Sequence, residues 1–319
     1  MKKSNRLTVY TLFLFVTIAL PFKFTWAQVN QDNLRKHIYH LADDKMKGRG
    51  TGSKEVKQAA DYIEKYLKKY KLTPKGTKRF RQTFEAHVRR VQVIDSIRTA
   101  ENVIGYLDNG APYTIVIGAH YDHLGEGMQG GSKDSLGVGA IHNGADDNAS
   151  GVAALLELAR HYSTNNIREN HNILFIAFGA EELGLVGSKH FTNNPTIPLN
   201  SILCMLNMDM IGRYNAEQGV AVIGYGTSKK WPDIFDKIQS PVKYYTGHDG
   251  NGGSDQTSFY KKDIPVLFFH TGGHPDYHMP TDDPDKIDYS SLQGIIELEI
   301  MVIDNIMQQK DKMDFQFTN

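Results

Sequence analysis

The sequence predicts an α/β fold: a single domain in which a mixed, mostly parallel β-sheet is sandwiched between helices. Three apolar or β-branched runs, at residues 113–119, 172–178 and 201–206, show no strict alternation of apolar and polar residues. This pattern is typical of strands buried on both faces of a sheet. Segments whose apolar residues recur with helical period precede and follow these runs, which favours helices packed on the sheet.

The N-terminal segment is the first element in chain order. Three basic residues precede an apolar stretch at residues 7–20, and the Thr-Trp-Ala sequence that ends at Ala27 suits cleavage after that residue. We predict a secretory signal peptide over residues 1–27 and one folded domain over residues 28–319. The apolar stretch is shorter than the roughly 20 residues needed to span a bilayer. The protein is therefore expected to be exported, periplasmic or secreted, with no stable membrane anchor after cleavage.

The remaining elements follow from periodicity. Helices are predicted at residues 53–70 and 292–306, because in each the apolar side chains share one face. Early strands, expected to be antiparallel, are predicted at residues 82–88, 90–97 and 102–107. A turn at residues 108–110 leads into the first buried run. The only cysteine, Cys204, lies within an apolar run and is expected to be a small buried core residue.

Chemically distinctive side chains follow the buried runs. His120, Glu182 and Asp209 each lie just past one run. In open α/β sheets ligands bind outside the carboxyl ends of the strands, so these side chains are expected to meet. Asp147 precedes an apolar-periodic helix in the stretch GADDNASG, and His278 lies in a polar turn near the end of the chain.

These five residues form the donor set of a two-metal site. Such a site needs one carboxylate that bridges both ions, together with a His and a carboxylate for each ion. Asp147 is the candidate for the bridge. Two zinc ions carry four positive charges and three carboxylates neutralise three, so one positive charge remains to hold a hydroxide.

Each residue taken alone has an ordinary structural explanation. An Asp before a helix usually caps it, a lone His after a strand is usually a loop residue, and a Glu pair favours a helix start. His278 could belong to a simple turn. Asp209 fits these explanations less well, because a buried carboxylate must be paired or metal-bound. The joint occurrence of the five residues at strand ends favours the metal site.

Ordered motifs carry a resemblance to a known family. They read GAHYDHLG, IHNGADDNASG, FGAEELGLVGS, NMDMIGR and DYHMPTDDPDKID, in that order along the chain. On these motifs the chain resembles the co-catalytic zinc aminopeptidases of metallopeptidase clan MH, family twenty-eight. Looser matches at residues 41–53 and 254–269 extend the likeness over nearly the whole chain after the leader. The resemblance implies a zinc exopeptidase-like fold and a catalytic domain over residues 28–319.

The resemblance also implies a role for each site residue. It places His120 and Asp209 on one zinc ion, Glu182 and His278 on the other, and Asp147 between them. It makes Glu181 the general base and Tyr277 the donor of a hydrogen bond to the oxyanion. It makes Asp122 and Asp255 carboxylates that lie behind the ligands, where Asp122 would orient His120. The peptide bond after Asp147 is implied to be cis. Where the family often has SDH, this chain has Ser254, Asp255 and Gln256, and we expect Gln256 to line the pocket.

The function implied is that of an exported di-zinc aminopeptidase. A metal-bound hydroxide would hydrolyse the N-terminal peptide bond of peptides with a free N-terminus, with Glu181 as general base. A glutaminyl cyclase is an alternative, although cyclases have Trp where this chain has Tyr277. A carboxypeptidase of the same clan, to which Arg213 could contribute, and an inactive binding ectodomain are the others. The presence of all five ligands and Glu181 argues against an ectodomain.

The composition argues against nucleic acid as a partner. The chain has 36 basic and 36 acidic residues and no run of Lys and Arg beside aromatic residues, so no nucleic acid partner is expected. The glycine-rich stretch at residues 125–144 lacks the strand and helix context of a phosphate-binding loop. We expect it to cover the mouth of the active site instead.

Overall fold

The computed structural model describes residues 29–135 and 137–318, so the predicted signal peptide lies outside the described residues. Within this range the strands form one nine-stranded sheet in the order β1-β3-β5-β4-β6-β9-β7-β8, with β2 paired to β3. The strands are β1 (Thr73–Pro74), β2 (Arg81–His87), β3 (Ile97–Leu107), β4 (Thr114–His120), β5 (Asn172–Phe178), β6 (Ile202–Met208), β7 (Val220–Ile223), β8 (Tyr244–Gly247) and β9 (Val266–His270).

The central strands β5, β4, β6 and β9 run parallel, whereas β3 is antiparallel to β1, β2 and β5. Every residue of β4, β5 and β6 is buried, as their unbroken apolar character predicts. The predicted α/β class, the mostly parallel centre and the antiparallel early strands are therefore confirmed.

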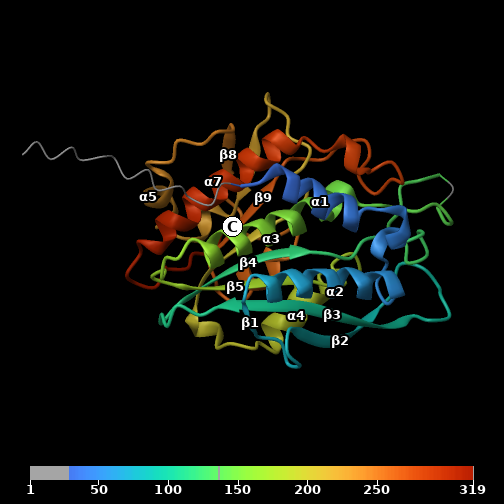
Figure 1. The fold of residues 1–319 in the computed structure, drawn as a ribbon, viewed down its shortest axis with the longest axis horizontal. Helices are drawn as coiled ribbons and strands as arrows, with labels where there is room; N and C mark the ends of the chain where they lie inside the picture. Colours follow the sequence, from blue (N-terminus) through green and yellow to red (C-terminus); the bar gives the residue numbers. More distant parts are fainter. Residues whose placement is uncertain (1–28, 136, 319) are drawn as a thin grey trace, which may run out of the picture.

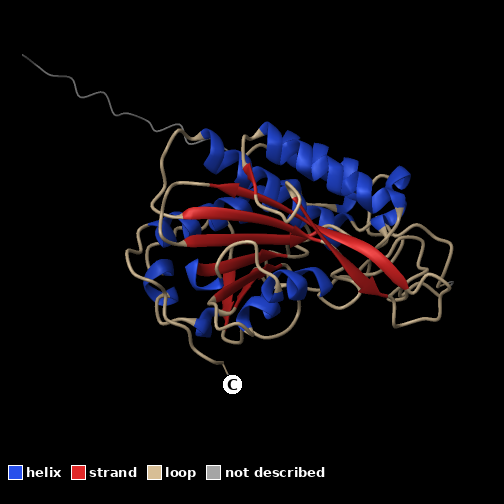
Figure 2. Cartoon of the chain, turned by 90° about the horizontal axis from the view of Figure 1, so that it is seen from below, coloured by secondary structure: helices blue, strands red, loops and turns tan. Residues whose placement is uncertain are grey.

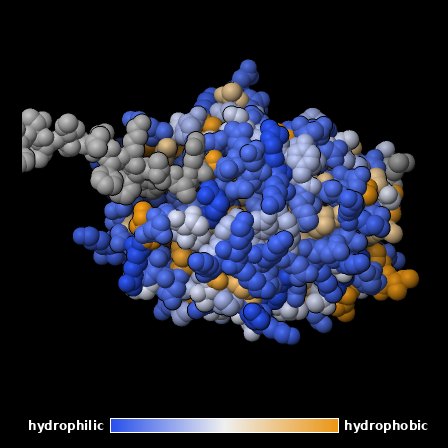
Figure 3. All heavy atoms as spheres, viewed as in Figure 1, coloured by the Kyte–Doolittle hydropathy of each residue, from blue (hydrophilic) through white to orange (hydrophobic). Residues whose placement is uncertain are grey.

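Helices cover both faces of the sheet (Figures 1 and 2). One layer contains α1 (Gln31–Leu41), α2 (Lys54–Lys69), α3 (Gly151–Thr164) and α7 (Tyr289–Met307), which contact one another. The opposite layer contains α4 (Val186–Asn193) and α6 (Gln256–Tyr260); α5 (Trp231–Phe235) packs on α7. The outer surface of the first layer is largely hydrophilic (Figure 3), as amphipathic helices require.

Alternate residues of a single strand supply the two cores. In β5, Phe175 belongs to the core under α1, α2, α3 and α7, whereas Ile176 and Phe178 belong to the core under α4 and α6. The two-residue period of a strand sends successive side chains to opposite faces. Both faces of β5 are therefore fixed by packing, which holds its C-terminal end rigidly. Cys204 is buried in the first core, as predicted.

The helix predicted at residues 53–70 is confirmed as α2, which Ser53 caps by accepting a hydrogen bond from the backbone N–H of Val56. The strand predicted at residues 90–97 is wrong. The register pairs His87 with Ile97, so the intervening residues form the connection of the β2–β3 hairpin. Ile94 is fully exposed there, because apolar spacing alone gives no strand without a surface to bury it.

Within the described part of the chain, none of the helices combines the length and the apolar character needed to cross a bilayer.

The buried imidazole of His37 in α1 leads to a prediction about stability. Burial, and to a lesser degree the nearby Lys36, His40 and Lys69, lowers the pKa of His37 from 6.5 to about 3. Unfolded chains bind the extra proton between these pH values, so stability falls as the pH falls through this window. At pH 5 the loss is about 2 kcal/mol relative to pH 8.

We expect His37→Gln to remove this contribution. The difference in the free energy of urea unfolding between wild type and variant should change by about 2 kcal/mol between pH 8 and pH 5. Taking the difference cancels other titrating groups that do not contact His37. His87→Gln, at an exposed position of β2, is the matched control. A wild-type-to-variant difference that stays constant with pH would contradict the prediction.

Candidate metal centre

The site lies at the carboxyl ends of the parallel strands. His120 is the last residue of β4, Glu182 follows β5, and Asp209 directly follows β6. Asp147 comes from the segment that enters α3, and His278 comes from the turn after β9. All five are buried. The structure thus brings together every residue of the predicted ligand set, from five separate segments.

One group of ligand atoms gathers around His120. Its Nε2 lies 3.2 Å from Oδ1 of Asp147 and 3.3 Å from Oδ1 of Asp209. Zinc bound at about 2.0–2.1 Å by tetrahedral ligands gives ligand-to-ligand distances of about 3.3–3.4 Å. These three atoms are therefore spaced as ligands of one zinc ion are.

A second group uses the other oxygen of Asp147. Nε2 of His278 lies 3.2 Å from Oδ2 of Asp147 and 3.3 Å from Oε1 of Glu182. Asp147 contributes one carboxylate oxygen to each group, which is the geometry of a bridging ligand. The donor set of two imidazoles and three carboxylates fits zinc in both groups.

His123 is a site residue that the sequence reasoning missed. Its Nδ1 lies 2.9 Å from Oε1 of Glu182 and 3.8 Å from Oδ2 of Asp147, and its side chain is fully buried. His123, Asp147 and Glu182 form a second cluster with the spacing of metal ligands. The available signal was the spacing of two histidines three residues apart at the end of β4.

Positive charge is what stabilises the carboxylates of this cluster. Burial raises the pKa of Glu182, as does Asp147, but His123 and His278 outweigh both and hold it at about 2. Burial lowers the pKa of His278, yet Asp147 and Glu182 raise it to about 10. The Glu182 carboxylate is thus stabilised by its two imidazole neighbours. A divalent cation would supply the same stabilisation.

Glu181 has the opposite behaviour. It lines the pocket and is partly exposed, and its backbone N–H donates to Oδ1 of Asp122 over 2.9 Å. Burial is the largest cause that raises the pKa of Glu181 well above its usual value, and the nearby carboxylates of Glu182, Asp255 and Asp209 add to it, whereas His120 lowers it. A carboxylate whose basicity is raised in this way is suited to accept a proton.

Backbone carbonyls orient the two predicted imidazole ligands. Nδ1 of His120 lies 3.1 Å from the carbonyl oxygen of Asp122, and Nδ1 of His278 lies 2.8 Å from that of Gly131. We expected the Asp122 carboxylate to orient His120, but its nearest oxygen is 3.9 Å away. That carboxylate accepts from Glu181 and Thr51 instead, because the chain turns directly after β4. The two contacts with backbone carbonyls fix the tautomer that each imidazole needs to bind a metal.

In the segment around Asp147, different residues cap the helix and face the candidate metal position. The peptide bond between Asp147 and Asn148 is cis, as the resemblance implied. Oδ1 of Asn148 accepts from the backbone N–H of Gly151, so Asn148 and not Asp147 satisfies the start of the helix. The Asp282 carboxylate accepts the backbone N–H groups of Asp146 and Asp147. The Asp147 side chain is left free to face both imidazoles.

Three residues with left-handed backbone conformation adjoin or form the site. The φ angles are +57° at Ala180, +56° at Met210 and +62° at His278. Non-glycine residues rarely adopt this region, and such strain persists only where the surrounding structure enforces it. Here it directs Glu181 and Asp209, the neighbours of Ala180 and Met210, towards the pocket.

The pocket beside the ligands has a volume of about 330 Å³. It is lined by Asp147, Glu181, Asp209, Met210, Gly253, Phe268, His270, Gly273, Tyr277 and His278. Burial raises the pKa of Tyr277, and so do the carboxylates of Asp147 and Glu182, so its hydroxyl stays protonated. Lys133, from the glycine-rich stretch, lies 4.0 Å from the centre of the Tyr277 ring. The stretch thus contacts one residue of the pocket wall, although none of its described residues lines the pocket.

Asp255 does not cap α6. Its side chain makes no capping hydrogen bond, and neither carboxylate oxygen has a hydrogen-bond partner among the described residues. Burial raises the pKa of Asp255 to about 7, and Asp209 and Asp122 add to the effect. Gln256, expected to line the pocket, lies behind its wall, where it accepts from Asn207 over 3.3 Å.

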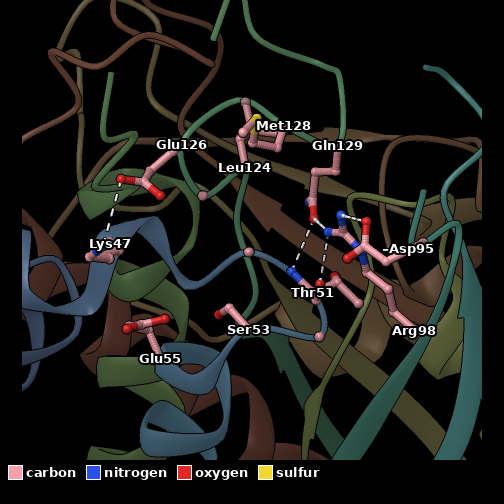
Figure 4. Close-up of a pocket in the computed structure, with 13 residues that line it drawn as sticks. Lys47, Thr51, Ser53, Glu55, Asp95, Arg98, Leu124, Glu126, Met128 and Gln129 are labelled. Atoms are coloured by element: carbon pink, nitrogen blue, oxygen red, sulfur yellow. Dashed lines mark hydrogen bonds and ion pairs between the residues drawn. The ribbon is translucent and has the colours of Figure 1, made fainter. Parts of the chain in front are cut away.

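A second cavity, of about 190 Å³, lies among residues 47–55, 95–98 and 124–129 (Figure 4). Its wall includes Arg98, whose guanidinium donates to the carbonyl oxygen of Thr51 and to Oε1 of Gln129. The hydroxyl of Thr51 donates to Oδ2 of Asp122 over 3.0 Å. Thr51 thus joins the wall of this cavity to the carboxylate of Asp122.

Arg49 holds the loops of the site together. It is completely buried, and its guanidinium donates to the carbonyl oxygens of Leu41, Tyr121, Asn143 and Gly144 over 2.5–3.0 Å. Tyr121 directly follows His120, and Gly144 begins the segment that carries Asp147. A single side chain therefore fixes two ligand-bearing loops relative to α1.

Comparisons with known proteins agree with this geometry. The family model of Peptidase family M28 matches residues 102–303. Leupeptin-inactivating enzyme 1 of Streptomyces exfoliatus is 30% identical over 238 residues, which cover 73% of this chain and 48% of that protein. Aminopeptidase YwaD of Bacillus subtilis is 26% identical over 228 residues, which cover 67% of this chain and 46% of the relative. The chain thus spans about half the length of the curated relatives it matches.

The fold is also found among solved structures. Glutaminyl cyclase of Porphyromonas gingivalis superposes with a TM-score of 0.67 at 16% sequence identity, over 87% of this chain and 99% of that one. This likeness concerns the fold.

The buried guanidinium of Arg49 leads to a second prediction about stability. Arg49→Met removes the guanidinium donor from four carbonyl oxygens, of which Gly144 keeps the backbone N–H of Ala149. Each unsatisfied buried group costs about 1–3 kcal/mol. We expect a loss of about 4 kcal/mol or more in the free energy of urea unfolding. Arg49→Lys should lose less, because an ammonium group supplies three donors. Arg79→Met, at an exposed position, is the control. If Arg49→Met unfolded at the wild-type urea concentration, Arg49 would not carry this role.

Proposed function

Because the chain belongs to peptidase family M28, we propose that it is an exported di-zinc aminopeptidase that removes residues from the free N-terminus of peptides. The observation that carries the proposal is the position of Asp147, with one oxygen in each of two ligand groups. The name of the relative from Bacillus subtilis supports the aminopeptidase assignment. Export rests on the signal peptide predicted at residues 1–27.

In this proposal His120 and Asp209 hold one zinc ion, Glu182 and His278 hold the other, and Asp147 bridges them. Bound zinc lowers the pKa of a coordinated water to about 7 and polarises a carbonyl group. Three carboxylates against two divalent ions leave one positive charge in the site. That charge favours an anionic nucleophile.

Glu181 is the proposed general base. Its carboxylate faces the pocket between the ligand groups, where it can take a proton from the attacking water and pass it to the leaving amine. The raised pKa of Glu181 suits both steps. The protonated hydroxyl of Tyr277 lines the same pocket and would donate to the developing oxyanion. Asp122 would position Glu181 by accepting the backbone N–H of Glu181, and the charge of Asp255 would help to raise the pKa of Glu181.

Charge at the pocket favours an N-terminus over a C-terminus. Asp147, Glu181 and Asp209 line it, and a peptide's α-ammonium group lies one residue from the bond to be cleaved. Arg213, the residue that could attract a substrate carboxylate, is paired with Asp276 at 3.0 Å. This pairing supports the aminopeptidase over the carboxypeptidase reading.

A glutaminyl cyclase remains the second candidate. The observation in its favour is the Asp255 carboxylate, which acts on the charge of Glu181 and has no hydrogen-bond partner among the described residues. It is free to bind a substrate group, and the matching Asp of cyclases belongs to a hydrogen-bond network near the reacting groups. A peptide with an N-terminal glutamine separates the two functions by product mass. A peptidase releases glutamine. A cyclase converts the N-terminal glutamine to pyroglutamate, releases ammonia and leaves every peptide bond uncut.

The first functional prediction separates the two adjacent glutamates. Glu181→Gln should keep the wild-type zinc content but lose about 2 to 4 orders of magnitude in turnover, since general-base catalysis is typically worth that much. Glu182→Gln should lose zinc instead, because it removes a charged ligand. Elemental analysis and turnover of an aminoacyl-anilide, measured on the same preparations, test both. The reverse pattern would exchange the roles of the two residues.

The second functional prediction tests the proposed activity. Short peptides with a free N-terminus should be shortened one residue at a time, and N-acetylated versions of the same peptides should not be cleaved, because acetylation removes the α-ammonium charge. Mass spectrometry of timed digests gives the order of release. The enzyme with Glu181→Gln is the control for contaminating peptidases. Trimming of the acetylated peptide from its C-terminus at a comparable rate would replace the aminopeptidase with a carboxypeptidase.

A further inference from the structure

We infer that His123 is an additional ligand of the zinc ion held by Glu182 and His278, so that the two ions of the site are unequal. This inference rests on the proposed zinc site and adds a residue to it. One ion would then have four protein ligands, the other only the three supplied by His120, Asp147 and Asp209.

Four atoms surround the proposed position. Nδ1 of His123 lies 2.9 Å from Oε1 of Glu182 and 3.8 Å from Oδ2 of Asp147. Nε2 of His278 lies 3.3 Å and 3.2 Å from the same two oxygens. A tetrahedral zinc ion with ligands at about 2.0–2.1 Å has ligand-to-ligand edges of about 3.3–3.4 Å. The two distances from His278 match this value, whereas the two from His123 lie below and above it. Both imidazoles thus approach the same two carboxylate oxygens.

The contact between His123 and Glu182 is not a hydrogen bond. The two atoms are 2.9 Å apart, yet neither Nδ1 of His123 nor Oε1 of Glu182 has a hydrogen-bond partner of acceptable geometry among the described residues. A ring N–H must point at its acceptor, and here it does not. Two unsatisfied atoms buried in this way cost free energy unless a third group lies between them. A cation in contact with both lone pairs is such a group.

The backbone holds the His123 ring in this position. Its carbonyl oxygen accepts from the side chain of Gln129 over 3.0 Å, and its N–H donates to the carbonyl of Arg49 over 3.2 Å. The ring packs on Gly144, where a Cβ atom would come within 2.6 Å of two ring carbons. Gly144 also has a φ of +58°, so both its backbone and its missing side chain leave room for the imidazole.

The additional ligand would give the two ions different coordination and therefore different roles. Sites with four protein ligands are closed, as in structural zinc sites, whereas catalytic sites have three protein ligands and an open position. The ion beside His123 would therefore bind more tightly and exchange slowly. The open coordination position would belong to the ion held by His120 and Asp209, and Asp209 lines the pocket together with Glu181.

Zinc titration of the metal-free full-length protein, in competition with a chromogenic chelator, tests this inequality. The wild type should take up two ions in two separate steps. His123→Ala should weaken the tighter step by more than the roughly 10–100-fold that loss of an outer contact costs. It should leave the weaker step within about threefold. His171→Ala is the matched control, since His171 is also buried but precedes β5, at the opposite end of that strand from Glu182. Unchanged affinities in His123→Ala would overturn the inference.

X-ray diffraction of the zinc-loaded wild type gives a readout that needs no variant to fold. Anomalous scattering at the zinc edge should place one ion about 2.0–2.1 Å from Nδ1 of His123. A distance beyond about 3 Å would overturn the inference even where two ions are bound. Uptake of a single ion by the wild type would contradict the proposed two-zinc site instead. The diffraction experiment would still decide the role of His123, because it shows which ligands hold the ion.

Discussion

The crowding of five carboxylates, four of them buried, at one end of a parallel sheet is the constraint on which the rest of this structure depends. Asp147, Glu181, Glu182, Asp209 and Asp255 share a small volume in which water can solvate few of them. Ionised groups removed from water are stable only when opposite charge or hydrogen bonds replace the solvent. The imidazoles of the site supply part of that charge. The ligand atoms converge at two points, each reached by one oxygen of Asp147, and this supports the proposed metal site over a salt-bridge network.

Such a cluster requires a rigid frame, since relaxation of any loop would let the carboxylates move apart. The parallel strands β4, β5 and β6 provide it, because packing on both faces fixes where each strand ends. Beyond the strand ends, unusual backbone geometry takes over. The left-handed conformations at Ala180 and Met210 turn the chain directly before Glu181 and after Asp209. Hydrogen bonds to backbone groups, from Arg49 and to Asp282, hold the remaining loops.

The sequence predicted this arrangement well where one physical signal dominates. The strand predicted at residues 172–178 matches β5 residue for residue, because a fully buried strand has an unbroken apolar run. Residues that follow such runs were then brought together as expected. Prediction failed where tertiary context decides. The apolar residues near Ile94 resemble a strand but find no partner surface. His123 was missed because a histidine in a loop has no periodicity, and its role depends on how the chain turns after β4.

The segment before the region matched by the family model completes the site. Arg49 and Thr51 lie outside residues 102–303, yet both act on groups inside them. Arg49 joins the loop after β4 to the loop that carries Asp147, and Thr51 donates to the carboxylate of Asp122, which in turn accepts the N–H of Glu181. A guanidinium that binds carbonyl oxygens adds positive charge without occupying a carboxylate, so the acids stay available for metal. The connection between α1 and α2 is therefore part of the candidate site, because Arg49 and Thr51 in it hold the loops of the site by hydrogen bonds.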